Sequence, residues 1–105
     1  MLLVTTEVLE DRKIDEVLGL VRGNTIRARH LGRDVMAGLR NVVGGEIKDY
    51  TRMLSQARDQ AIERMVKEAE DLGANAIVGV RFTTSQTMSG AAEILAYGTA
   101  VRLKD

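Results

Sequence analysis

The chain has 105 residues, of which 45% are hydrophobic and 29% are charged, and this balance predicts one folded domain and excludes a disordered chain. Lys and Arg together number 15, as do Asp and Glu, so the formal net charge is zero, which argues against a dedicated nucleic-acid-binding protein. There is no cysteine, which excludes a disulfide framework, and no apolar run approaches the roughly 18 residues of a membrane helix. We therefore expect a cytoplasmic protein that has no membrane partner.

The first third of the chain has the composition of β-strands. Residues 2–9 begin with apolar and β-branched residues, and without a preceding basic segment they predict a strand and not a signal peptide. Residues 14–28 carry apolar residues without helical spacing, which predicts one long strand or two short ones. Gly19 and Gly23 lie inside this stretch and mark β-bulges or points where another segment approaches closely.

Two helices are expected in the middle of the chain. Apolar residues at helical intervals predict a short helix over residues 32–43, ended by Gly44 and Gly45. A longer helix is predicted over residues 50–72, with Asp49 or Thr51 as its N-cap and Gly73 as its stop. Its apolar stripe consists of Leu54, Ala57, Ala61, Ile62, Met65, Ala69 and Leu72.

The last third predicts a β-hairpin, in which Ser89 and Gly90 turn the chain. Residues 74–87 alternate, which places Ala76, Val78, Val80 and Phe82 on one face and Ile77, Gly79, Arg81 and Thr83 on the other. Residues 92–103 place Leu95, Tyr97, Thr99, Val101 and Leu103 on one face and Ile94, Ala96, Gly98 and Ala100 on the other. Because both strands are apolar on both faces, we expect the second face of the sheet to meet another surface, most simply a copy of the same chain.

The predicted fold is therefore α+β, a mostly antiparallel sheet with two helices in the order β-β-α-α-β-β. This order and a set of short segments resemble the YbjQ-like family of small uncharacterised proteins, whose domain is described as "putative heavy-metal-binding". The matching segments are residues 4–6, 33–34, 42–45, 50, 57–59, 73–80 and 98–101. The resemblance implies one domain over residues 1–105, with a dodecin-subunit-like fold assembled as a ring-shaped homopentamer. It points to Thr5, Thr6, Arg33, Asp34 and Tyr50 as candidate ligand-binding residues, and it brings no established activity.

Metal binding is the first functional hypothesis, and a divalent metal ion is the cofactor it would require. Soft metals and zinc prefer Cys and His ligands, and the chain offers His30 alone. A fivefold ring would turn one His30 into five ligands. Glu46 and Asp49 lie in one predicted loop and suit a harder cation. The alternative is that His30 is simply an exposed polar residue.

Anion or phosphate binding is the second hypothesis. Residues 22–40 contain five arginines against one acid, Asp34: Arg22, Arg27, Arg29, Arg33 and Arg40. The N-terminus of the predicted helix 32–43 would offer free N–H groups, and Arg33 would offer a bidentate fork. A simple ion pair between Arg33 and Asp34 explains the same residues. Nucleic acid is not an expected partner, because no aromatic residues are interleaved with these arginines.

An enzymatic function has little support in the sequence, although Tyr50 and Asp34 are residue types that can do acid–base chemistry. The chain contains none of the GxSxG, Walker A, HExxH or GxGxxG motifs, which carry nucleophilic, phosphoryl-transfer, zinc-protease and dinucleotide chemistry. We therefore expect a non-enzymatic homo-oligomer. It is either a module that binds a metal or small ligand at subunit interfaces, or a purely structural or partner-binding ring.

Overall fold

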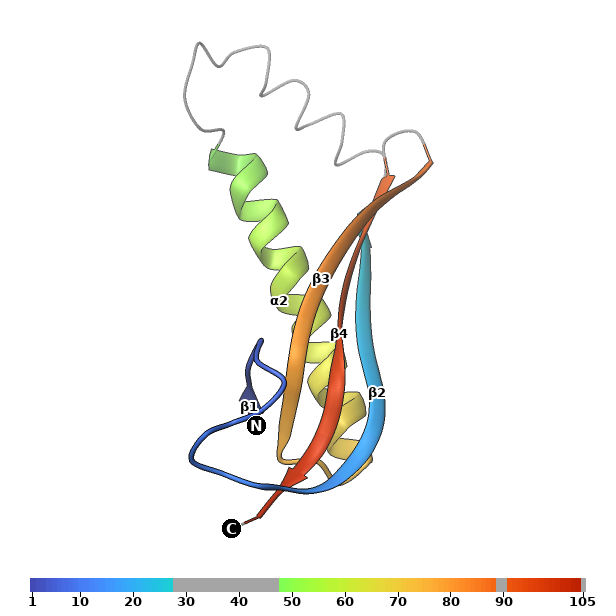
Figure 1. Ribbon diagram of the computed structural model, residues 1–105. Helices are drawn as coiled ribbons and strands as arrows, with labels where there is room; N and C mark the ends of the chain where they lie inside the picture. Colours follow the sequence, from blue (N-terminus) through green and yellow to red (C-terminus); the bar gives the residue numbers. More distant parts are fainter. Residues whose placement is uncertain (28–47, 89–90, 105) are drawn as a thin grey trace.

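The computed structural model describes residues 1–27, 48–88 and 91–104, and within them the chain forms four strands and one helix. The elements are β1 (Leu2–Leu3), β2 (Ile14–Arg27), α2 (Lys48–Asp71), β3 (Ala76–Met88) and β4 (Ala91–Leu103) (Figure 1). The α+β class is therefore confirmed. The predicted helix over residues 32–43 and the turn at residues 89–90 lie outside the described residues.

The strands form one sheet in the order β1-β3-β4-β2. β4 lies in the middle and is antiparallel to both β2 and β3, as the predicted hairpin requires. β1 is parallel to β3 and pairs with it only at Leu2 and Leu3. The sheet is therefore mixed, although its two long pairings are antiparallel, and β2 forms one of its edges.

α2 packs on one side of the sheet, which we call the helix side, because small residues line its inner face. Ala57, Ala61, Met65 and Ala69 are completely buried. Gly23 of β2 lies directly beneath them, and a Cβ atom on it would collide with the backbone of Ala61 and Met65. The close approach that Gly23 predicted is thus confirmed. The absence of a side chain there lets the helix rest on the strand, and burial of the apolar stripe stabilises the pair.

Two hydrogen bonds made by neighbouring residues of β2 also hold the helix on this strand. The buried Thr25 donates its hydroxyl to the carbonyl oxygen of Ala57 at 2.7 Å. Arg64 donates to the carbonyl oxygen of Asn24 at 2.6 Å. Both bonds join α2 to β2, so the helix lies over the β2 edge of the sheet and not over its centre.

α2 ends as the sequence predicts. Gly73 has a φ of +86°, its N–H donates to Glu70 at 2.9 Å, and the N–H of Ala74 donates to Ala69 at 3.0 Å. These two bonds form a Schellman motif, which needs a left-handed residue that glycine supplies most easily. Leu72 follows the last helical residue and is exposed, so it is not part of the buried stripe.

The predicted helix start is wrong by two residues. α2 begins at Lys48, so Asp49 and Thr51 lie inside its first turn and neither precedes the helix as an N-cap. An N-cap residue must stand just outside the helical dihedrals to accept bonds from the first free N–H groups. The helix therefore starts before both of the polar residues that the sequence offered as N-caps.

The face assignment of β3 is also wrong beyond Val78. Gly79 has a φ of +62°, and the register with β4 shifts between Val78 and Arg81. This is a β-bulge, in which Gly79 and Val80 together oppose one residue of β4. Val80 and Phe82 therefore lie on the helix side, whereas Arg81 shares the other side with Val78.

The side of the sheet opposite α2, which we call the open side, carries a second core at its lower end. Ala76, Val78, Val101 and Leu103 are buried there beneath Val4, Leu9 and Ile14. The N-terminal segment supplies this cover by passing across the lower ends of the strands (Figure 1). At the lower ends of β3 and β4, this second face is therefore covered by the chain itself and needs no other surface.

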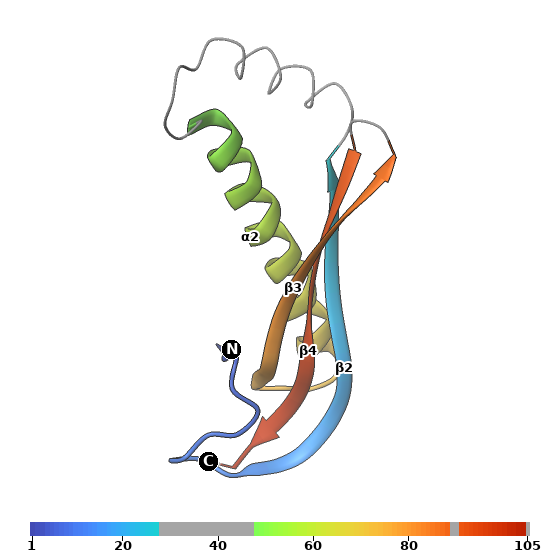
Figure 2. The same ribbon diagram turned by 45° about the horizontal axis from the view of Figure 1, so that its top comes forward.

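The subunit is elongated. Its Cα radius of gyration is 16.9 Å and its principal extents are 52 × 25 × 16 Å, whereas a compact domain of about 100 residues has a radius of gyration of about 13 Å. The N-terminal end of α2 and the upper ends of β3 and β4 diverge (Figure 2). No helix in the described residues is long and apolar enough to cross a membrane.

Candidate functional site

Thr5 and Thr6 lie on the outer edge of β3, where their backbone holds the N-terminal segment in place. The N–H of Gly79 donates to the carbonyl oxygen of Thr6 at 2.8 Å. Arg81 donates to the carbonyl oxygen of Thr5 at 2.7 Å and to that of Val80 at 2.9 Å. Both threonines are exposed. Their carbonyl groups are thus engaged in structural bonds, while their side chains face solvent.

The structure does not bring Thr5 and Thr6 together with Tyr50. Tyr50 and Asp49 belong to the first turn of α2, at the end of the helix that lies farthest from β1 (Figures 1 and 2). The side chains of both residues lie outside what the structure describes. The predicted residues His30, Arg33, Asp34 and Glu46 lie in the segment 28–47, which is also outside the described residues.

Metal ligands do not cluster in the described part of the subunit. Across residues 1–27, 48–88 and 91–104, no group of three or more His, Cys, Asp or Glu residues is placed to hold a metal ion. Three or four such ligands are the usual requirement of a protein zinc site.

The β2 edge of the open side carries the most exposed apolar side chains of the sheet among the described residues. Three of its apolar side chains are largely exposed, namely Val17 at 65%, Leu20 at 66% and Ile26 at 58%. All three come from β2, whose pairing with β4 directs alternate residues to this side. Scattered exposed apolar residues are ordinary, whereas a contiguous exposed apolar patch is typical of an interaction surface.

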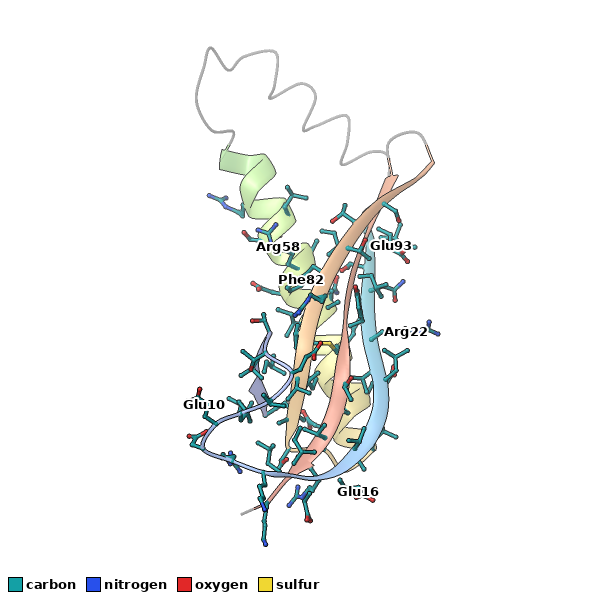
Figure 3. The ribbon with its side chains drawn as sticks, in the orientation of Figure 1. Glu10, Glu16, Arg22, Arg58, Phe82 and Glu93 are labelled. Carbon is teal, nitrogen blue, oxygen red and sulfur yellow. The ribbon has the colours of Figure 1, made fainter. Side chains whose placement is uncertain are left out.

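A row of polar side chains crosses the same surface. Arg22 of β2 and Arg81 of β3 both pair with Tyr97 of β4, so two arginines flank one tyrosine on the open side. Figure 3 shows Arg22 extending away from β2 on the side opposite α2. The exposed guanidinium of Arg22 is suited to bind an anion, whereas Arg81 donates to the carbonyl oxygens of Thr5 and Val80.

Arg81 is the residue that reasoning from the sequence missed. Simple alternation places Arg81 beside Ile77, but the bulge turns it to the open side, where it reaches Thr5. The available signal was Gly79, since a glycine inside a strand pattern marks a bulge. Once a bulge is placed there, the face of every later β3 residue is reversed.

The fold is that of a small α+β protein with a mixed four-stranded sheet. A family model described as "Putative heavy-metal-binding", the YbjQ model, matches residues 1–104. The chain is 62% identical to a UPF0145 protein of Archaeoglobus fulgidus, covering 99% of this chain and 96% of that one. It is 56% identical to a UPF0145 protein of Methanosarcina acetivorans, covering 98% and 97% respectively. The chain therefore belongs to the YbjQ (UPF0145) family.

The fold itself has a counterpart among solved structures. A protein of unknown function from Pediococcus pentosaceus, which belongs to the DUF74 family, superposes with a TM-score of 0.61. The two sequences are 18% identical, and the match covers 99% of this chain and 98% of the other. At this identity the likeness concerns the fold alone.

Proposed function

We propose that this protein is a non-enzymatic cytoplasmic homo-oligomer, assembled as a ring of five subunits. The observation that carries the proposal is the β2 edge of the open side, where Val17, Leu20 and Ile26 are each more than half exposed. Burial of such surface between copies removes it from water, at roughly 25 cal/mol for each Å² of apolar area. The number five and a dodecin-subunit-like character are those that the family resemblance implies.

The elongated shape supports the same proposal. A radius of gyration of 16.9 Å means that this chain buries less of its own surface than a compact chain of equal length. Subunits of permanent oligomers can have this shape because their neighbours complete the core.

Native mass spectrometry of the purified protein tests the assembly. We expect one dominant species with five times the subunit mass at micromolar concentration. A monomer under these conditions would contradict the proposal. Size-exclusion chromatography with light scattering, over a hundredfold range of protein concentration, separates a stable ring from weak association.

We further propose that the ring binds a divalent metal ion where subunits meet. The support is the description of the family and the chemistry of His30, Glu46 and Asp49, which symmetry would repeat around the ring. Calorimetric titration with zinc and copper should give saturable binding that His30→Ala weakens at least tenfold. The matched control is His30→Gln, which keeps a polar side chain without an imidazole. No heat with either metal at millimolar concentration would exclude the site.

Anion binding is the second candidate, and the row of Arg22, Tyr97 and Arg81 on the open side favours it. Inorganic phosphate should bind more weakly as salt rises, because exposed charges are screened. Arg22→Ala should weaken binding several-fold, and Arg102→Ala, which removes an exposed arginine at the lower end of β4, should not. If the affinity for phosphate does not change with ionic strength, or is the same in Arg22→Ala as in the natural chain, this row of residues is not the binding site. A ring that binds neither phosphate nor metal would be a purely structural or partner-binding assembly.

A further inference from the structure

We propose that neighbouring subunits join by strand pairing at the edges of their sheets. Residues 20–27 of β2 in one copy would lie parallel to residues 81–86 of β3 in the next. This inference rests on the proposed homo-oligomer and specifies its interface. The partner is therefore a second copy of this chain, bound head to tail.

Both edges are open in their upper halves. β2 is an outer strand of the sheet, so among the described residues no strand pairs with its outer edge. On the other side, the N-terminal segment follows the edge of β3 only as far as Val80, whose N–H donates to Val4 at 3.0 Å. Unpaired strand edges present free N–H and C=O groups, which makes them templates for another strand.

Both edges are blocked in their lower halves. The register of β2 is interrupted between Ile14 and Glu16 and again between Val17 and Gly19, and such bulges disrupt pairing. At the same height, β1 covers the outer edge of β3. Ala76 of β3 pairs with Leu2 on one side and with Val101 on the other, and Val101 also pairs with Val17 of β2. The open stretch of each edge therefore begins only above these features.

The two open stretches lie at the same height in the sheet. Gly23 and Phe82 are both paired with Ala96 of β4, and Ile26 and Ser85 are both paired with Glu93. β2 and β3 are each antiparallel to β4, so they run parallel to one another. Two copies placed side by side would therefore bring the open stretch of β2 against the open stretch of β3 at the same height, without a shift along the strands. A head-to-tail contact of this kind forms a ring when the rotation from copy to copy closes.

The off-centre helix explains the exposure of Phe82. Phe82 is on the helix side of β3 and is 45% exposed, because α2 lies over β2 at the opposite edge. The two labelled side chains Phe82 and Arg58 in Figure 3 mark β3 and the flank of α2 that borders it. In the proposed arrangement Phe82 stands at the height of Gly23 of the neighbour, beneath that neighbour's α2. Arg64 of that neighbour, whose side chain is hydrogen-bonded to Asn24, is placed to cover the phenyl ring of Phe82 with its apolar stem.

Disulfide trapping tests the interface, because the chain has no cysteine of its own. Asn24 and Thr83 are both exposed, both pair with Leu95, and both face the open side. Within one subunit β4 separates them by two strand spacings, about 9–10 Å, which is too far for a disulfide. A bond in the double variant Asn24→Cys/Thr83→Cys therefore joins two copies. Ile26→Cys/Ser85→Cys provides a second pair two residues farther along.

We expect oxidation of either double variant to give a ladder on non-reducing gels that ends at the full ring, and each single variant to stay uncrosslinked. The matched control is Glu16→Cys/Thr83→Cys, which moves one thiol about 25 Å down the same strand and should give no ladder. Native mass spectrometry is run first on each variant. An oligomer without a ladder, or dimers from Asn24→Cys alone, would overturn the proposed edge pairing and leave the oligomer standing. A monomer would overturn the proposed function itself.

Discussion

Gly23 shows how one residue sets the distance between the helix and the sheet. A Cβ at this position would collide with backbone atoms of Ala61 and Met65, and backbone cannot rotate away as a side chain can. We expect Gly23→Ala to push α2 off β2 and to lower the free energy of unfolding by about 1–3 kcal/mol. Urea denaturation followed by circular dichroism measures the change.

A control separates this steric effect from the general effect of alanine. Asp59→Ala lies on the exposed side of α2 and should shift the free energy of unfolding by no more than about 0.5 kcal/mol. If Gly23→Ala unfolds at the same urea concentration as the natural chain, the helix does not rest on the strand at this point. The hydrogen bond from Thr25 to Ala57, which is 2.7 Å long in the structure, would then also be longer, because it depends on the same close approach of α2 to β2.

At the scale of an element, the bulge in β3 requires the left-handed backbone conformation of Gly79, whereas there is room beside Gly79 for a side chain. Its φ is +62°, and an added Cβ would meet only Glu7 at 3.9 Å. We therefore expect Gly79→Ala to cost about 1–2 kcal/mol of unfolding free energy, because an L residue is strained in the left-handed region. Gly79→Asn should recover part of the loss, since Asn tolerates this region. Equal stability of all three proteins would contradict a left-handed residue here.

The same element shows how far the fold follows from the sequence. The 24-residue α2 was predictable because apolar spacing and the stop at Gly73 agree. The bounds of β2, β3 and β4 were predicted to within two residues, whereas the strand predicted over residues 2–9 is wrong, because only Leu2–Leu3 form a strand there. The faces of β3 beyond Val78 were not, since alternation carries no information about where a bulge inserts an extra residue. Gly79 marked the place, but only pairing with β4 shows that the register changes there.

The candidate site was less predictable than the fold. Thr5 and Thr6 were named because they match family segments, and the structure places their carbonyl oxygens in bonds with Arg81 and Gly79. These bonds join residues more than 70 positions apart, and sequence spacing cannot reveal such contacts. Tyr50 was grouped with the threonines on the same basis, yet α2 carries it to the other end of the molecule. Shared membership of family segments does not imply a shared location.

At the scale of the whole molecule, the two sides of the sheet are covered by different means. α2 covers the β2 edge of the helix side, and the N-terminal segment covers the lower end of the open side. Within the described residues, what stays exposed is the β2 edge of the open side, together with Phe82 at the β3 edge of the helix side. These surfaces adjoin the two open strand edges. One head-to-tail contact between copies would therefore account for the open edges and for Phe82 together.

Phe82 allows this last point to be tested without disturbing the subunit. It is 45% exposed and is not part of either core cluster, so Phe82→Asp should leave the subunit folded and the far-UV circular dichroism unchanged. An aspartate buried under a neighbouring helix would be an unpaired charge in an interface, which costs several kcal/mol. We therefore expect Phe82→Asp to dissociate the oligomer at micromolar concentration in native mass spectrometry. Val8→Asp is the matched control, since Val8 is 72% exposed in the N-terminal segment, away from both open edges, and should leave the oligomer intact. If Phe82→Asp remains fully assembled, Phe82 faces solvent in the ring and the neighbour's α2 does not cover it.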